Sequence, residues 1–314
     1  MRAHLETILP AVWPNLRHVV WARERWDTPD GDFIDLDWSL GAEGLSTTDT
    51  PSAPLLVIFH GLEGSSRSAY SVALAAAARD LGWPAVVAHF RGCSGALNRQ
   101  PRAYHAGDIQ EIDWILGRLE SVHAGPLLAV GVSLGGNALM RWLGSGLLVP
   151  ERLMAAAALS APLDLAAAGA AIDTGLNRWI YGRLFLQTMR RKALAKHAQF
   201  PGLFDLSRVM RASTLREFDD AFTAPLHGFE GVDHYWQVAS AAPVLPQVAR
   251  PALLINPLND PLVPAASLPN PDWLNQQTGG RVRSWQPRRG GHVGFARAMA
   301  PLVLRWLGQH IDRR

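Results

Sequence analysis

Short apolar runs alternate with amphipathic segments over most of the chain. Five of these runs show no alternation with polar residues, and they cover 55–59, 84–90, 127–132, 154–159 and 252–255. Such runs are typical of strands that are buried on both faces of a parallel sheet. The spacing of apolar residues between them predicts helices over 69–81, 108–120 and 134–143. This succession predicts a doubly wound α/β fold, with a mostly parallel central sheet and helices on both of its faces.

Both ends of the chain add elements to this sheet. Within residues 19–40, apolar residues alternate with aspartates over 34–38, and a turn sequence precedes them at 28–31. This pattern predicts two strands joined by the turn. At the other end, residues 282–285 and 294–311 predict the last strand and the last helix.

The interval 161–250 does not fit a simple strand–helix repeat. It separates two predicted strands by 90 residues, whereas a crossover with its helix needs about 30. The insertion starts at the C-terminal end of a strand, the side on which open α/β sheets bind ligands. We therefore predict a helical cap over 163–245, on a core domain formed by 1–162 and 246–314. The alternative is an additional helical bundle with no role at the site.

One predicted cap helix carries an apolar stripe. Within 176–197, Leu176, Trp179, Ile180 and Leu184 fall at helical spacing. A stripe of this kind has to be buried, against either the edge of the sheet or another cap helix. We therefore predict that Trp179 and Leu184 line the substrate pocket. The alternative is that they form the interior of the cap.

The sharpest motif is Gly131-Val132-Ser133-Leu134-Gly135, a G-x-S-x-G sequence. It follows one buried strand and opens a helix, which is the setting that a nucleophile elbow requires. In such an elbow the serine is raised above the sheet on a tight turn, and larger side chains at the glycine positions would collide with the adjacent helix or strand. Ser133 is therefore the candidate nucleophile. The alternative is a glycine-rich turn with an incidental serine.

A serine hydroxyl needs a base to remove its proton. In hydrolases with such an elbow the triad residues follow one another in the order Ser, then Asp or Glu, then His. His292 follows the last predicted strand, in the glycine-rich segment 290–294. Three other histidines, His197, His227 and His234, fall in the predicted cap. His310 falls in the last helix. Position and order therefore favour His292.

The histidine in turn needs an acid that holds its tautomer and stabilises the imidazolium. Asp260 comes shortly after the strand 252–255 and 32 residues before His292. Asp272 competes with it. However, Asp272 follows an Asn-Pro pair that marks a helix start, where an acid is explained by the helix dipole. We therefore predict Asp260 as the third member of the triad.

A tetrahedral oxyanion needs N–H donors that are already in place. One should be the backbone N–H of Leu134, directly after Ser133. The second should come from the loop after the first buried strand, where the sequence His-Gly-Leu-Glu-Gly over 60–64 permits a sharp turn. The N–H of Leu62 is the best candidate. The neighbouring Glu63 is not expected to aim its carboxylate at the oxyanion, because like charges would oppose the reaction.

Composition and charge narrow the classes of protein. The chain of 314 residues is 48% hydrophobic and 18% charged, which excludes disorder. Its single cysteine, Cys93, excludes an internal disulfide and a multi-cysteine zinc site. No zinc-protease, dinucleotide or P-loop motif occurs, so we expect no metal and no cofactor. The net charge is +3 with scattered arginines, which favours a solvated surface over nucleic-acid binding.

The sequence contains no predicted transmembrane segment. The most apolar stretch, 154–163, is far shorter than the ~20 residues needed to span a bilayer. Glu6 and Pro10 interrupt any apolar region of a signal peptide near the first residue. A cytoplasmic location is therefore expected, and the sequence gives no indication of the oligomeric state.

Several segments together resemble the YheT-like branch of the α/β-hydrolase superfamily. They are 59–64, 89–95, 98–99, 104–107, 215–220, 227–229 and 290–295. The resemblance implies an α/β-hydrolase fold with Ser133, Asp260 and His292 at the positions of the family's triad. It also implies hydrolysis of lipid or short- to medium-chain esters, with acyltransferase activity in some relatives. One departure is Tyr235-Trp236, where two tyrosines are expected.

Residues and resemblance together predict a cofactor-free serine hydrolase that cleaves carboxylic esters and acts in lipid metabolism. Its substrate would be a small ester or a lipid. Acyl transfer or amide cleavage by the same triad is an alternative, and so is a non-catalytic lipid-binding or scaffold protein on the same fold.

Overall fold

The central sheet of the computed structural model, which describes residues 2–12, 18–39 and 52–311, has eight strands. Their order is β1-β2-β4-β3-β5-β6-β7-β8. The first two strands, β1 (Trp21–Asp27) and β2 (Phe33–Ser39), pair antiparallel, and β2 is also antiparallel to β4. The pairs from β4 to β8 are parallel. The predicted doubly wound, mostly parallel sheet is therefore confirmed.

The parallel strands coincide closely with the predicted strands. They are β3 (Leu55–Phe59), β4 (Ala85–Ala88), β5 (Leu127–Val132), β6 (Leu153–Leu159), β7 (Ala252–Ile255) and β8 (Val282–Trp285). Because residues of one strand point alternately to the two faces, a strand that is covered on both sides must be apolar throughout. All five residues of β3 are buried in this way.

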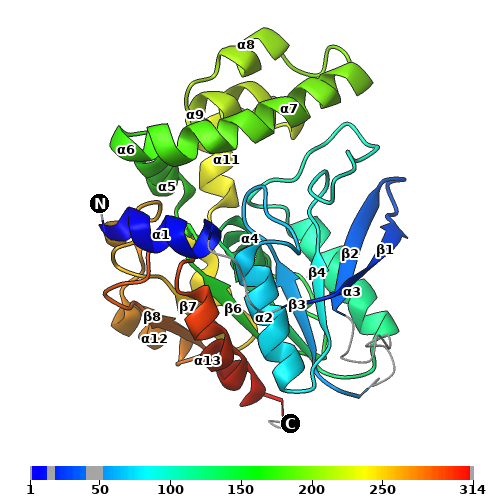
Figure 1. Ribbon diagram of the computed structural model, residues 1–314, viewed down its shortest axis with the longest axis vertical. Coiled ribbons are helices and arrows are strands. Elements are labelled where there is room, and N and C mark those ends of the chain that lie inside the picture. Colours follow the sequence, from blue (N-terminus) through cyan, green and yellow to red (C-terminus); the bar gives the residue numbers. More distant parts are fainter. Residues whose placement is uncertain (1, 13–17, 40–51, 312–314) are drawn as a thin grey trace.

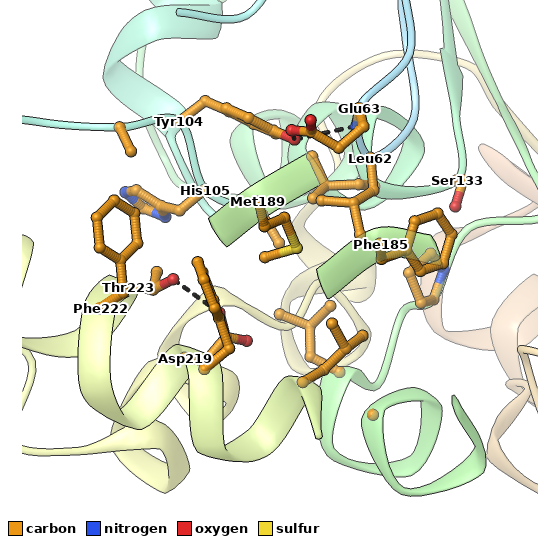
Figure 2. Close-up of a pocket in the computed structure, with 18 of the residues that line it drawn as sticks. Leu62, Glu63, Tyr104, His105, Ser133, Phe185, Met189, Asp219, Phe222 and Thr223 are labelled. Atoms are coloured by element: carbon orange, nitrogen blue, oxygen red, sulfur yellow. Dashed lines mark hydrogen bonds between the residues drawn. The ribbon is translucent and has the colours of Figure 1, made fainter. Parts of the chain in front are cut away.

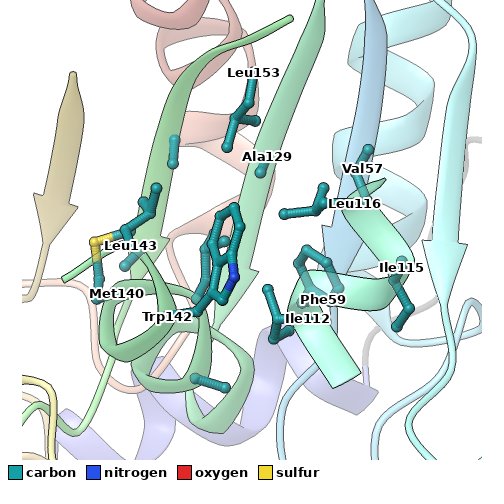
Figure 3. Packing of buried hydrophobic residues seen from close by; sticks show 14 of the residues in the cluster. Val57, Phe59, Ile112, Ile115, Leu116, Ala129, Met140, Trp142, Leu143 and Leu153 are labelled. Carbon is teal, nitrogen blue, oxygen red and sulfur yellow. The ribbon is translucent and has the colours of Figure 1, made fainter. Parts of the chain in front are cut away.

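Helices cover both faces of the sheet (Figure 1). One face packs against α2 (Ala69–Asp80) and α13 (Ala296–Gly308). The other packs against α3 (Ile109–Val122), α4 (Leu134–Leu143) and α12 (Pro271–Thr278). Figure 3 shows this second layer, with Trp142 of α4 and Ile112 of α3 lying against Phe59. Each fully buried side chain of this size contributes about 2 kcal/mol of apolar transfer energy.

The interval between β6 and β7 is helical, as predicted. It contains α5 (Leu165–Ile172), α6 (Gly175–Asn177), η2 (Arg178–Gly182), α7 (Arg183–Gln199), α8 (Leu206–Arg211), α9 (Leu215–Phe218), η3 (Asp219–Thr223), α10 (Ala224–Leu226), α11 (Val232–Ala239) and η4 (Ala242–Gln247). We call residues 163–245 the cap. Most of its helices gather above the sheet in Figure 1, and some share a small apolar core around Phe218 and Phe222.

An additional helix precedes the sheet. α1 (Arg2–Val12) contains Pro10, and the sequence pattern did not predict it. In Figure 1 it lies between the cap and α13. His4 Nδ1 lies 3.2 Å from the hydroxyl of Tyr181, so α1 contacts the cap directly. No helix among the described residues is both long and apolar enough to cross a membrane.

Candidate active site

Ser133 occupies the turn between β5 and α4. Its backbone is in a left-handed region, with φ 51° and ψ −120°. A non-glycine residue held in such a region costs on the order of 1–3 kcal/mol, and such strain is concentrated at functional sites. The turn is stabilised where it joins the sheet, because the N–H of Ser133 donates to the carbonyl of Leu159 at 2.8 Å.

The two motif glycines are required by close backbone contacts. A Cβ on Gly131 would lie 2.4 Å from the carbonyl oxygen of Gly135, and one on Gly135 would lie 2.4 Å from the carbonyl oxygen of His60. Neither contact leaves room for a methyl group. The turn can therefore bring α4 against both β5 and the loop after β3 only with glycine at these positions.

The three residues predicted as a triad form one hydrogen-bonded series. Ser133 Oγ lies 2.9 Å from His292 Nε2, and His292 Nδ1 lies 2.8 Å from Asp260 Oδ2. The Asp260 side chain is fully shielded from solvent. Its other oxygen accepts the backbone N–H groups of Leu262 and Val263 at 2.8 and 3.1 Å. The carboxylate is thus fixed in the orientation in which it faces the imidazole.

Asp272 lies elsewhere. It is exposed in the first turn of α12, whose N-cap Asn270 accepts the N–H of Asp272 at 2.9 Å. The structure therefore brings Asp260 to His292 and leaves Asp272 in the helix-start position that its sequence indicated.

The loop that carries His292 is held by α1. Thr7 Oγ1 accepts the backbone N–H of His292 at 2.9 Å. Glu6 Oε2 accepts the N–H of Gly290 at 3.2 Å and the side-chain amide of Asn259 at 2.7 Å. These contacts lower the pKa of Glu6, first through Asn259. Sequence reasoning missed this support, because nothing in residues 2–12 marks a partner so distant in the chain.

The loop after β3 offers one free N–H in the expected place. The N–H of Gly61 donates to the Tyr70 hydroxyl at 2.9 Å, and the N–H of Glu63 donates to the Tyr104 hydroxyl at 3.0 Å. Among the described residues, no acceptor is found for the N–H of Leu62 between them or for that of Leu134. Both predicted oxyanion donors are therefore available to a ligand.

His60 fixes the same loop without taking part in the series. Its Nδ1 lies 2.7 Å from the carbonyl oxygen of Gly61, and its Nε2 accepts the N–H of Phe90 at 3.1 Å. Burial lowers the pKa of His60 to about 3, so the ring is neutral at physiological pH. A neutral ring can donate through Nδ1 and accept through Nε2, which joins the loop to the end of β4.

A cavity of about 140 Å³ lies over Ser133, and cap residues line part of its wall. Its lining includes Leu62, Leu134 and His292 from the core and Phe185 and Met189 from α7. In Figure 2, Ser133 and Phe185 lie towards one side of the cavity, and His105 and Phe222 lie towards the other. The cap and Ser133 thus border one mainly apolar space.

The prediction that Trp179 and Leu184 line this cavity is wrong. Their exposed fractions are 70% and 57%, and neither side chain reaches the cavity. The continuous helix of α6, η2 and α7 has apolar residues on both faces, so spacing alone does not tell which face points inward. The inward face is the one with Phe185 and Met189.

The cap contributes one carboxyl group to the cavity. Asp219 accepts hydrogen bonds from Thr223 Oγ1 at 2.7 Å and from Trp236 Nε1 at 2.9 Å. Burial raises its pKa from 3.8 to about 6, against the effect of these two donors. Asp219 begins the π-helical turn η3, and π-turns are frequent at functional sites.

This pKa predicts a pH dependence of stability. The folded chain binds the Asp219 proton more tightly than the unfolded chain, so the contribution is greatest in acid and is lost as the pH rises through 6. The loss should be about 2 kcal/mol between about pH 4 and pH 7. Asp219→Asn imitates the neutral carboxyl group and should remove this part of the dependence. Urea unfolding of both proteins across that range measures it, and equal slopes would contradict the assignment.

Neither a metal nor a reactive thiol is indicated at the site. Over the described ranges, no three His, Cys, Asp or Glu side chains lie together so that they could hold a metal ion. Burial raises the pKa of Cys93 to about 11, so its thiol is protonated and a poor nucleophile.

Comparisons with known proteins place the chain in a family. The family model described as alpha/beta hydrolase fold matches residues 54–297. The chain is 39% identical to YheT, a candidate esterase of Escherichia coli K12, over 93% of this chain and 84% of YheT. It is 30% identical to the human phospholipase ABHD3, over 90% of this chain and 68% of that protein. The chain therefore belongs to the α/β-hydrolase family, on a branch with esterase-like and lipase-like members.

Solved structures agree on the fold. An esterase of Pyrococcus furiosus superposes with a TM-score of 0.57 at 14% identity, over 94% of this chain and 92% of that one. Esterase Est1E of Butyrivibrio proteoclasticus superposes with a TM-score of 0.56 at 16% identity, over 93% and 99%. At these identities the likeness concerns the fold alone.

Proposed function

We propose that the protein is a serine hydrolase that cleaves carboxylic esters with an apolar acyl group. The observation that carries this proposal is the hydrogen-bonded series of Ser133, His292 and Asp260 beneath a mainly apolar cavity. The strained backbone of Ser133 also supports it, because a non-catalytic lipid-binding protein would have no use for that strain.

The reaction follows from the positions of these groups. Ser133 Oγ attacks the ester carbonyl while His292 Nε2 takes its proton, and Asp260 stabilises the imidazolium that forms. The N–H groups of Leu62 and Leu134 hold the negative oxygen of the tetrahedral intermediate. The imidazolium then protonates the leaving alcohol, which leaves an acyl group on Ser133. Water, activated by His292, releases the acid and restores the serine.

The names of two relatives suggest the substrate class. YheT is named as a candidate esterase and ABHD3 as a phospholipase, so both act, by name, on ester bonds. Small apolar esters and lipid esters are therefore the substrates to test first. A series of p-nitrophenyl esters from acetyl to palmitoyl tests the reaction and the acyl length together. Turnover that is abolished by a fluorophosphonate is expected, and no turnover of any ester would contradict the proposal.

Two adjacent residues of α7 have different surroundings, because one faces the pocket and the other faces solvent. Phe185 lines the cavity, whereas Leu184 is exposed on the other side of the same helix. Phe185→Ala should enlarge the acyl site and shift the preferred acyl chain to a greater length. The ratio of kcat/KM for the octanoyl ester to that for the acetyl ester should rise at least about threefold, because each buried methylene contributes about 0.8 kcal/mol. Leu184→Ala is the matched control and should leave the ratio unchanged. Equal ratios in both variants would show that α7 does not select the acyl chain.

A further inference from the structure

The loop that bears Leu62 carries an acidic side chain next to it. Glu63 has a left-handed backbone, with φ 56°. Its Oε1 accepts the Tyr104 hydroxyl at 2.7 Å, while its backbone N–H donates to that same hydroxyl at 3.0 Å. Figure 2 shows Tyr104 lying against Glu63 and Leu62 at the edge of the cavity. Tyr104 thus binds both ends of one residue and holds the peptide next to Leu62 in place.

A cation from the cap completes this arrangement. Lys192 of α7 places its Nζ 2.7 Å from Glu63 Oε1 and 3.2 Å from Cys93 Sγ. The side chain of Glu63 is only 12% exposed and that of Lys192 only 30%. Water therefore screens this ion pair less than it screens a pair on the open surface. The pair connects the cap to the loop of the core that holds the Leu62 N–H.

The charge of Glu63 has a consequence for catalysis. A carboxylate one residue from an oxyanion donor opposes the negative charge that develops on the substrate oxygen, and the effect is strong where the dielectric is low. A positive charge beside the Glu63 carboxylate cancels most of the electric field of that carboxylate. The site therefore needs either Lys192 beside Glu63 or no charge at position 63.

We propose that Lys192 and Glu63 are positioning residues, through which the docked cap orders the Leu62 loop and neutralises it for oxyanion binding. This inference rests on the proposed ester hydrolysis. It makes the cap more than a cover, because the oxyanion site is complete only when α7 lies against the core.

The test compares single and double substitutions in the full-length protein with p-nitrophenyl butyrate. Lys192→Met leaves the Glu63 charge uncompensated and should lower kcat about tenfold or more with a smaller change in KM. Glu63→Gln should lower kcat less than Lys192→Met does. The double variant Lys192→Met/Glu63→Gln should recover at least about threefold in kcat over Lys192→Met, because the unpaired charge is gone. A double variant no more active than Lys192→Met would overturn the proposal.

Lys196 provides a comparison on the same helix. It also joins the cap to the core, with Nζ 2.9 Å from the carbonyl oxygens of both Asn98 and Gln100, and it does not contact the Leu62 loop. Lys196→Met should lower the melting temperature at least as much as Lys192→Met, but its kcat should be clearly higher. Equal losses of kcat at equal losses of stability would mean that both lysines only hold the cap, and this would overturn the inference.

A replacement variant and the activity of the wild-type protein make the remaining outcomes decisive. If Lys192→Met does not fold, Lys192→Gln replaces it, and the same recovery by Glu63→Gln is required. Wild-type protein without ester turnover would overturn the proposed function, and this inference with it. Active wild-type protein together with an unimpaired Lys192→Met variant would overturn this inference alone.

Discussion

Replacing Ser133 with alanine is expected to lower kcat for p-nitrophenyl esters by at least about 10⁴-fold, with little effect on folding. The hydroxyl is the group that we propose to form the acyl-enzyme. It lies 2.9 Å from His292 Nε2, and no neighbouring group on the turn can replace it. Removal of the hydroxyl leaves the oxyanion donors and the cavity intact, so substrate binding should persist. Steady-state kinetics and thermal unfolding of the purified variant measure the two effects.

A matched substitution shows that the loss is specific. Ser121 lies exposed at the end of α3, where its hydroxyl donates to the carbonyl of Arg118. Ser121→Ala should keep kcat within about twofold of wild type. A Ser133→Ala variant that keeps more than a hundredth of the activity would contradict the assignment of the nucleophile.

Replacing Asp260 with asparagine should lower kcat by about 10⁴-fold. The Asp260 carboxylate accepts hydrogen bonds from His292 Nδ1 and from the N–H groups of Leu262 and Val263. An asparagine amide has an NH₂ group in place of one carboxylate oxygen, so it would point an N–H at one of these partners. The imidazole would then adopt the wrong tautomer, or the loop would lose a hydrogen bond. In both cases the charge of the imidazolium would go uncompensated.

The control for this prediction is Asp272→Asn, which changes an exposed carboxylate in the first turn of α12. We expect a change in kcat of at most about twofold and a small loss of stability, because only a helix-dipole interaction is removed. If Asp272→Asn were instead the inactive variant, the third residue of the series would be wrongly assigned.

The sheet and the hydrogen-bonded series were readable in the sequence for physical reasons. A parallel strand buried on both faces has to be uniformly apolar, so β3, β5 and β7 begin and end at their predicted residues. Ser133 and His292 lie in turns where glycines cannot be replaced by larger residues. Asp260 lies in the loop after β7. Each of these signals is local, which is why a single sequence carries it.

Other features depend on contacts between distant segments. Asp35 and Asp37, which alternate with apolar residues in β2, are buried. Arg25 and Arg23 of β1 pair with them at 2.7 Å. The contact of Thr7 with the His292 loop joins positions 285 residues apart. No spacing rule within one segment could have predicted either of these arrangements.

The division of roles within the cap follows the same principle. The helix that contains α7 has apolar side chains on its outer face, such as Trp179, and on its inner face, such as Met189. Periodicity shows that both stripes exist, but only the position of the core determines which of them meets the substrate. The boundaries 163 and 245 of the cap also remain a prediction.

Mapping the covalent adduct of a fluorophosphonate by mass spectrometry tests the central claim most directly. The reagent phosphonylates a serine only where a base removes the serine proton and an oxyanion site binds the phosphonyl oxygen, so it reports the whole arrangement at once. We predict one adduct per chain, located on Ser133, with loss of ester turnover in proportion to labelling. An adduct on another residue, or full labelling of the Ser133→Ala variant, would contradict the account.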